Sequence, residues 1–177
     1  MQYNNGKITF VRLTIKEEKK MKKKLSILME WIRPAGIVLV YFLAEYLGND
    51  AISKFHILGP IMVIVMSGTV AFESLILGEV GSEKIGYKPN RPYQIQSGLN
   101  NLATAVTALL VFTLDWGRYA DATIVTAMLL FFILSSANHA ATSIMEHNMK
   151  PVNLMRPIMT LLLVGLLLPP MIKALIH

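Results

Sequence analysis

Long apolar runs separated by short polar stretches constrain this chain more than any other feature of its sequence. Hydrophobic residues occupy 54% of the 177 positions and charged residues 16%, whereas charged residues make up about 25% of soluble domains. A run of about 20 mostly apolar residues is long enough to cross a bilayer as a helix. The sequence therefore predicts an all-α, polytopic transmembrane helix bundle that forms one domain over residues 25–177.

Five segments are predicted to span the membrane, as a four-helix core preceded by an N-terminal helix. The first segment is the least apolar because Glu30 and Arg33-Pro34 interrupt it, so four spans, with this segment on the membrane surface, are the alternative. Asp121 is placed to cap the fourth segment, and Pro169-Pro170 is expected to break the fifth. The predicted spans are Ser26–Gly48, Ile57–Gly78, Pro92–Leu114, Asp121–Met145 and Pro151–Leu175.

The N-terminal 24 residues form a polar tail that ends in a run of lysines. Because the tail is charged and poor in aromatic residues, we expect it to be disordered. An alternative is that translation starts at Met21, since the Lys-Glu-Glu just upstream is what the codons of a ribosome-binding site would encode. In that case residues 1–20 are not translated.

Lysine and arginine gather on one side of the predicted topology. Basic residues are enriched in cytoplasmic loops, so we expect a multi-pass protein of the inner (cytoplasmic) cell membrane with its N-terminus inside and its C-terminus outside. The net charge of +6 lies at helix flanks, which favours the lipid bilayer over nucleic acid as partner. The predicted cytoplasmic cations outside the tail are Lys84, Lys88, Arg91, Lys150 and Arg156, and those on the other side are Lys54, Arg118 and Lys173.

Ionisable and amide side chains concentrate in the predicted cytoplasmic half of the bundle. A charged group at that depth costs a few kcal/mol, roughly, unless it faces another polar group, water or a ligand. Helical spacing places Ser135, His139, Thr142 and Glu146 on one stripe, and Gln96, Asn100, Thr104 and Thr107 on another. We expect these stripes to converge on a pocket, with Arg156 paired to Glu73 or Glu146. The candidate ligand-binding residues are Glu73, Asn100, Asn101, His139, Glu146 and Arg156.

Three interpretations of this cluster remain open. In the first, the polar groups only fix helix register, in a purely structural subunit of a membrane complex or in a homo-oligomer. In the second, they bind or transport a small molecule, a proton or a lipid. A third interpretation is a metal-dependent membrane oxidoreductase, or a membrane subunit of one, with His139, Glu146 and His147 as ligands. The spacing matches no HExxH motif. No catalytic residue and no cofactor is predicted, and the absence of cysteine excludes disulfides and thiolate-bound metals.

The polar motifs resemble those of an uncharacterised family of small prokaryotic integral membrane proteins. They are Ala71-Phe-Glu73, Gly78-Glu79 with Ser82-Glu83-Lys-Ile-Gly86, Gln96-Ser-Gly-Leu-Asn100-Asn101 and Glu146-His147-Asn148. The resemblance covers roughly residues 57–175 and implies a four-helix membrane core with the first segment as an addition. More distantly, the Gln-x-Gly-x-Asn opening of the third segment is similar to that of DoxX-like four-helix proteins. The resemblance implies no activity, substrate or cofactor.

Overall fold

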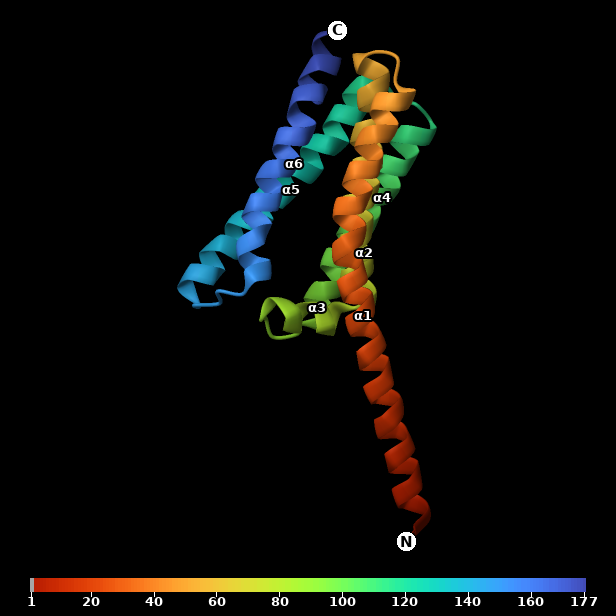
Figure 1. Cartoon of the computed structure of the whole chain (residues 1–177), viewed down its shortest axis with the longest axis vertical. Helices are drawn as coiled ribbons and strands as arrows, with labels where there is room; N and C mark the ends of the chain where they lie inside the picture. Colours follow the sequence, from red (N-terminus) through yellow and green to blue (C-terminus); the bar gives the residue numbers. More distant parts are fainter. Residues whose placement is uncertain (1) are drawn as a thin grey trace.

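The computed structural model describes the backbone of residues 2–177 and the side chains of residues 13–177. Within this range the chain forms six helices and no strand, and five of the helices are long and apolar enough to cross a membrane. The predicted all-α fold with five spans is therefore confirmed (Figure 1). The helices are α1 Gln2–Leu47, α2 Ala51–Ile76, α3 Gly78–Ile85, α4 Arg91–Thr113, α5 Arg118–Met145 and α6 Pro151–Ile176.

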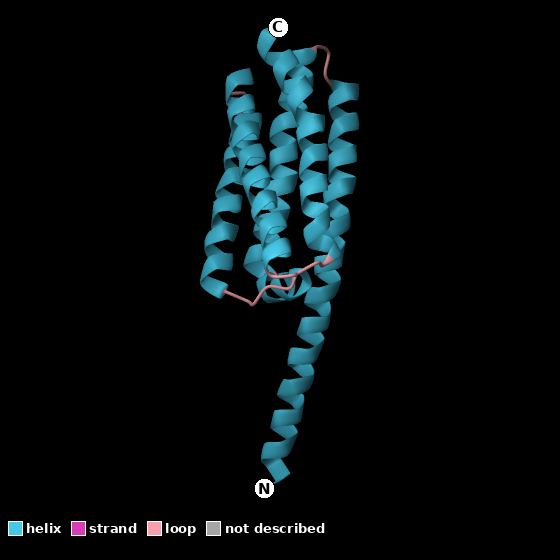
Figure 2. Cartoon of the chain, turned by 90° about the vertical axis from the view of Figure 1, so that its left-hand side faces the viewer, coloured by secondary structure: helices cyan, strands magenta, loops and turns pink. Residues whose placement is uncertain are grey.

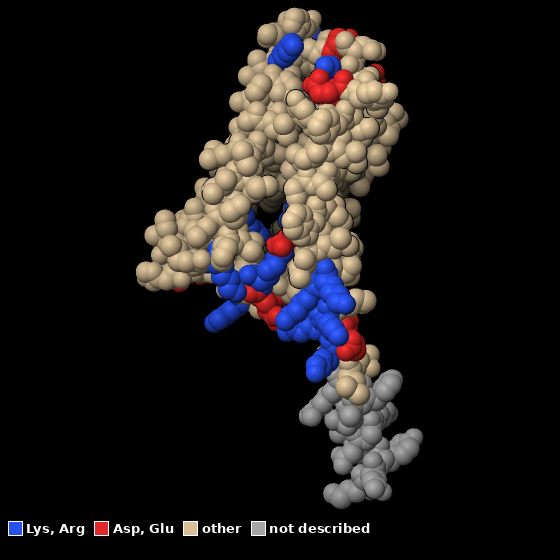
Figure 3. Space-filling model, in the orientation of Figure 1, with Lys and Arg blue, Asp and Glu red and all other residues tan. Residues whose placement is uncertain are grey.

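The loops alternate between the two ends of the bundle. Helix α3 and the loops 86–90 and 146–150 lie at the end that we call the basic end, and the loops 48–50 and 114–117 lie at the opposite end with the C-terminus (Figure 2). Lysine and arginine side chains crowd the basic end of the visible face in Figure 3. The long helices thus cross the bundle alternately up and down, as expected for a multi-pass membrane protein.

The five long helices form two arms. One arm contains α1, α2 and α4, the other contains α5 and α6, and α2 packs against helices of both arms. Figure 1 shows the arms close together near the C-terminus and apart toward the basic end, where α3 lies across the space between them. Within the described part of the chain, α1 contacts α2 and α3 and no other helix.

Helix α2 supplies much of the hydrophobic core, because it is the helix that both arms share. Its side chains Phe55, Met62 and Val63 are fully buried and pack in one cluster with Val125 of α5 and Leu167 of α6. By contrast, the outer faces of all five long helices carry exposed large apolar side chains. In a protein of this kind such faces contact lipid rather than water.

Helix α1 continues past the bundle at the basic end, and its backbone is helical back to Gln2 (Figure 2). Between Leu13 and Lys24 nearly all side chains are exposed, and the ion pair of Lys19 with Glu83 ties this stretch to α3 at 2.8 Å. That hydrogen bond from the Lys19 ammonium holds the pKa of Glu83 below its ordinary value. The expected disorder of residues 1–24 and the alternative start at Met21 stay predictions.

Two helices begin earlier than predicted. Helix α2 begins at Ala51 instead of Ile57, because Asp50 and Ser53 form a capping box: the Ser53 amide donates to Asp50 Oδ1 at 2.7 Å, and the Asp50 amide donates to Ser53 Oγ at 3.0 Å. Hydrogen bonds from the backbone and side chain of Ser53 to the Asp50 carboxylate hold the pKa of Asp50 below its ordinary value. Helix α5 begins at Arg118 after Gly117, whose φ of 87° suits glycine. Asp121 is therefore not its cap.

The expected break at Pro169-Pro170 is wrong. Helix α6 runs without interruption from Pro151 to Ile176 through both prolines. Proline fixes φ near a helical value and removes one hydrogen bond per residue, and membrane helices tolerate such local losses where neighbouring groups compensate. The proline pair therefore does not end the span.

Gly98 of α4 packs closely against α2. A Cβ built on Gly98 would lie 2.7 Å from Leu75 Cγ and 3.1 Å from Ser74 Cβ, so a larger residue requires these side chains of α2 to shift. We expect Gly98→Val to lower the free energy of unfolding by about 2 kcal/mol through overpacking. Unfolding of the purified protein in detergent, followed by circular dichroism, measures this loss.

Gly68 of α2 provides the matched control for this substitution. No atom lies within 4 Å of a Cβ built on Gly68, so Gly68→Val adds the same group without a clash. We expect the control to unfold at nearly the same detergent concentration as the natural chain. Equal losses for the two variants would contradict the close packing of α2 and α4 at Gly98.

Candidate functional site

The arm of α1 and α2 carries an ion-pair network near the basic end. Arg33 of α1 pairs with Glu73 of α2, and its Nε donates a hydrogen bond to Thr69 Oγ1 at 3.0 Å. The ammonium of Lys84, on α3, lies 3.6 Å from Glu73 Oε1. At 1.5 Å per residue, Glu73 lies about 5 Å inside the end of α2. This acid is therefore compensated by two cations from neighbouring helices.

Lys84 also joins α3 to α1. Its ammonium forms an ion pair with Glu30 at 2.8 Å and donates a hydrogen bond to Ser26 Oγ at 3.0 Å. Ser26, Glu30 and Arg33 recur at spacings of four and three residues, so they lie on one face of α1, the face that packs against α2 and α3. Lys84 thus fixes α1 in register at the level of Glu73.

Across the space between the arms, a second polar group links α5, α6 and the loop after α3. Arg156 Nη1 of α6 donates to His139 Nε2 of α5, and His139 Nδ1 lies 3.1 Å from the hydroxyl of Tyr87. The rings of Tyr87 and His139 are stacked with centroids 5.6 Å apart. His139, with only 7% of its surface exposed, is the buried centre of the group.

The hydrogen bonds determine how this group is protonated. Because Arg156 can only donate, His139 accepts at Nε2 and is the neutral imidazole with its proton on Nδ1. That proton is donated to the Tyr87 oxygen, so the Tyr87 hydroxyl keeps its own hydrogen to donate elsewhere. No carboxylate among residues 13–177 lies within ion-pair distance of Arg156. The group therefore presents N–H and O–H donors without an acidic acceptor.

The loop that carries Tyr87 is held in place by two asparagines. Asn148 Nδ2 and Asn153 Nδ2 both donate to the carbonyl of Ile85, at 2.8 and 3.0 Å. Asn153 is fully buried, and its Oδ1 accepts no hydrogen bond from the described residues. Tyr87 follows directly after Gly86, whose φ of 82° turns the chain at the end of α3. Its position beside His139 is thus set by α6 and the 146–150 loop.

Charged side chains of both arms face one opening. In Figure 3, blue and red atoms surround a hollow between the arms above the basic end. The charges that interact with Arg156 belong to Arg33, Glu73, Glu30 and Tyr87, which lie on the other arm or in the loop after α3. Cations of the site are thus Arg33, Lys84 and Arg156, and its carboxylates are Glu30 and Glu73.

The structure brings together only some of the predicted site residues. Arg156 is bonded to His139 and interacts electrostatically with Glu73, whereas the side chains of Asn100 and Glu146 are exposed. Asn101 is buried, but its Nδ2 donates to the Ser97 carbonyl of its own helix at 2.9 Å. The expected pairing of Arg156 with Glu73 or Glu146 is wrong, because Arg33 is the hydrogen-bonded partner of Glu73.

The polar stripe of α4 faces outward for a simple reason. The Thr104 hydroxyl donates to the carbonyl of Asn100 at 3.0 Å, so the helix satisfies its own threonine and a pocket is not required. Gly98, Asn101, Ala105 and Ala108 instead belong to the buried face of α4. With this face buried, the stripe of Gln96, Asn100, Thr104 and Thr107 is largely exposed.

Sequence reasoning missed three members of the site: Arg33, Lys84 and Tyr87. From the sequence, Arg33 was named only as an interruption of the first apolar segment and Lys84 only as a cytoplasmic cation, and Tyr87 was not singled out. A signal for Arg33 existed, because a cation within a membrane span requires an oppositely charged partner. A signal for Tyr87 is absent, since its role depends on how the loop after α3 folds.

The predicted metal ligands are not assembled. Among the side chains that the structure describes, no three His, Asp or Glu residues lie close enough together to hold a metal ion. Helix α5 ends at Met145, so Glu146 and His147 lie in the following turn with exposed side chains, far from the buried His139 stripe. The oxidoreductase interpretation therefore gains no support.

A second buried ionisable pair lies near the opposite end. Asp121, with 0% of its surface exposed, accepts from His56 Nδ1 at 3.0 Å, and the His56 ring stacks on Phe112 with centroids 5.2 Å apart. The contact joins α2, α4 and α5. Sequence reasoning assigned His56 no role and Asp121 a capping role, so this pair was missed.

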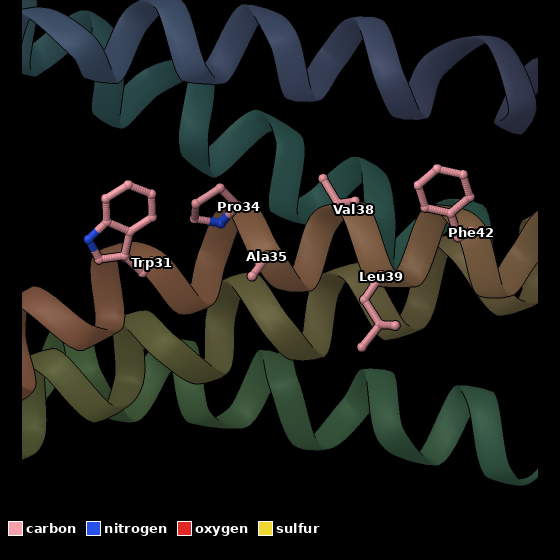
Figure 4. Close-up of a pocket in the computed structure, with 6 residues that line it drawn as sticks. All are labelled: Trp31, Pro34, Ala35, Val38, Leu39 and Phe42. Atoms are coloured by element: carbon pink, nitrogen blue, oxygen red, sulfur yellow. The ribbon is translucent and has the colours of Figure 1, made fainter.

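An apolar groove on α1 lies apart from the polar site. Helical spacing places its lining residues on the side of α1 opposite Arg33, and most of them are exposed. Exposed apolar side chains on a spanning helix are what lipid contact requires, so we assign the groove no ligand. Its lining, shown in Figure 4, consists of Trp31, Pro34, Ala35, Val38, Leu39 and Phe42.

The fold and the charge distribution define a multi-pass α-helical membrane protein with a polar layer near its basic end. The chain belongs to the family of unknown function DUF6790, whose model matches residues 49–175. The match confirms the resemblance to an uncharacterised family, and it contains α2 to α6 but not α1. No curated protein and no solved structure matches the chain.

Proposed function

We propose that this protein binds a small anionic group, a phosphate or a carboxylate, in the opening between its two arms. The observation that carries the proposal is the Arg156 guanidinium, which donates to a neutral imidazole and has no carboxylate partner among the described side chains. A partly buried cation without an acid is costly. An anion bound to Arg156 compensates this cost through charge-assisted hydrogen bonds.

The donor groups around Arg156 support an anion more than another ligand. Arg156 retains four N–H groups beyond the one given to His139, and the Tyr87 hydroxyl retains its hydrogen. Planar guanidinium groups bind carboxylate and phosphate through two parallel bonds. A site of this composition repels metal cations and offers little to an apolar molecule.

The anion has two sources with the same chemistry. A lipid head group reaches the opening laterally from the bilayer, and a soluble metabolite reaches it from the aqueous phase at the basic end. The positive-inside rule favours that end in the cytoplasm, where the inner leaflet carries anionic lipids. We propose the cell membrane of a prokaryote as the location of the protein. A distant relationship to DoxX-like proteins, and assembly as a homo-oligomer or as a subunit of a membrane complex, also stay proposals.

Arg156→Gln should abolish most of the binding. Loss of charge-assisted hydrogen bonds of about 1.5–3 kcal/mol corresponds to an affinity roughly 10- to 100-fold weaker. The measurement is the rise in the unfolding temperature of the purified protein in a phosphatidylcholine nanodisc. The probes are inorganic phosphate or succinate added to the solution, and phosphatidylglycerol added to the nanodisc lipid. Stabilisation by phosphate or succinate identifies a soluble ligand, and stabilisation by phosphatidylglycerol alone identifies a lipid.

Lys88→Gln is the matched control for the Arg156 substitution. Lys88 is exposed in the loop after α3, so the variant loses the same charge at the same end without touching the opening. We expect it to bind each probe as the natural chain does. Equal weakening in both variants would reduce the site to a diffuse surface charge, and no stabilisation of the natural chain by any probe would overturn the proposed function.

The orientation is tested separately. If the basic end is in the cytoplasm and all five helices span, the C-terminus lies outside and the N-terminus inside. A reporter fused after His177 should then report a position outside the cytoplasm, and a reporter fused before the lysine run should report a position inside it. Alkaline phosphatase and green fluorescent protein fusions give this two-sided readout. Both reporters on one side of the membrane would mean that one of the five helices does not cross it.

A further inference from the structure

We infer that Arg33, supplied by the N-terminal helix, keeps Arg156 available for the anion by occupying Glu73. This inference rests on the anion-binding function proposed above and names a device that controls the same site. Arg33 belongs to α1, whereas Glu73 and Arg156 belong to the part of the chain that the family model matches. The cation that pairs with Glu73 therefore comes from outside the part of the chain that the family model matches.

The contacts show why Glu73 is a competitor for Arg156. Glu73 interacts electrostatically with Arg156 across the opening, although Arg33 is the residue that holds its Oε2. The other oxygen, Oε1, is buried and accepts no hydrogen bond from the described residues. Glu73 and Glu30 are the carboxylates that interact electrostatically with Arg156, and the interaction with Glu73 is the stronger. Without Arg33, the carboxylate of Glu73 is therefore the acid that competes for the guanidinium of Arg156.

Lys84 does not replace Arg33 in this role. Its ammonium is 2.8 Å from Glu30 and 3.6 Å from Glu73, so Glu30 is its closer partner. Lysine is also a point charge, whereas arginine forms a planar fork that matches a carboxylate. Arg33 in addition donates to Thr69 Oγ1, which fixes the guanidinium beside Glu73. Arg33 acts on the anion through Glu73 and is a positioning residue.

The expected effect is a change of partner for Arg156. In Arg33→Gln, an Arg156–Glu73 ion pair forms and must break before an anion binds. If about one molecule in ten has this pair broken, the apparent affinity for the anion falls by about tenfold. In the double variant Arg33→Gln, Glu73→Gln, the competitor is gone and affinity returns to that of the natural chain. The return distinguishes competition from a direct bond between Arg33 and the anion.

The test measures binding of inorganic phosphate and of phosphatidylglycerol to the full chain in nanodiscs, for the natural protein and four variants. The variants are Arg33→Gln, Glu73→Gln, the double variant and Lys24→Gln, an exposed lysine of the same helix. We expect weaker binding in Arg33→Gln only. Weak binding in both Arg33→Gln and the double variant would overturn the inference, because Arg33 would then bind the anion itself.

The remaining outcomes separate this inference from the proposed function. Unchanged binding in Arg33→Gln, with binding by the natural chain intact, overturns the role of Arg33 and leaves the anion site standing. Absence of binding by the natural chain overturns the proposed function and with it this inference. Circular dichroism of each variant confirms the helical fold, and restored binding in the double variant itself shows that loss of Arg33 did not unfold the site.

Discussion

Glu73→Gln is expected to lower the free energy of unfolding by about 3 kcal/mol, because removing one partner of a buried ion pair leaves the other charge uncompensated. The side chains of Arg33 and Glu73 are 22% and 17% exposed, so water reaches neither freely. Arg33 keeps its bond to Thr69 but loses its acid. Unfolding in mixed detergent micelles, followed by the fluorescence of Trp31 and Trp116, measures the loss.

Two further variants serve as controls for this prediction. Glu79→Gln removes an exposed carboxylate of α3 and should leave the unfolding curve unchanged. Arg33→Gln, Glu73→Gln removes both charges and should recover most of the lost stability, since two neutral amides cost less to bury than one unpaired ion. A Glu73→Gln variant as stable as the natural chain would contradict the prediction, because it would show that Arg33 needs no acid at this position.

His56→Leu should destabilise the protein by a similar amount, about 3 kcal/mol, at neutral pH. Asp121 is fully buried, and His56 is its hydrogen-bond donor, so the substitution leaves a carboxylate without a partner in an apolar environment. Asp115, in the α4–α5 turn, also acts on Asp121, and Arg118, at the start of α5, donates to the carbonyl of Ala174. The same micelle unfolding assay applies.

The pairing is tested by a double-mutant cycle. Asp121→Asn removes the charge, so its combination with His56→Leu should cost less than the two single losses added together. His177→Leu, at the exposed terminal histidine, is the control and should unfold like the natural chain. Additive losses in the cycle would show that His56 and Asp121 stabilise the bundle independently.

Hydropathy was sufficient for the architecture, because transfer of about 20 apolar residues into lipid outweighs local propensities. The depth of Glu73, His139 and Arg156 could also be predicted, since depth depends only on the number of residues from a helix end. Which side chains of neighbouring helices face one another could not be predicted. Three cations were available for Glu73, and only tertiary packing brings Arg33 to it and leaves Arg156 beside His139.

The pair of His56 and Asp121 escaped for a different reason. Placing the start of α2 at Ile57 left His56 in a loop, and starting α5 at Asp121 made that residue a cap. The capping box of Asp50 and Ser53 begins α2 six residues earlier, and the turn at Gly117 begins α5 three residues earlier. A small error at a helix start thus concealed a buried interhelical contact.

The ion pair between Arg33 and Glu73 also bears on how the nascent chain enters the bilayer. Inserted alone, α1 carries an unpaired arginine and α2 an unpaired glutamate, and each isolated charge makes insertion into the bilayer less favourable. The two helices are joined by the short 48–50 loop, so they can leave the translocation channel together as a hairpin with the charges already neutralised. Biogenesis of the first two spans is then a coupled event, and α1 is retained in the membrane by its neighbour as much as by its own apolar residues.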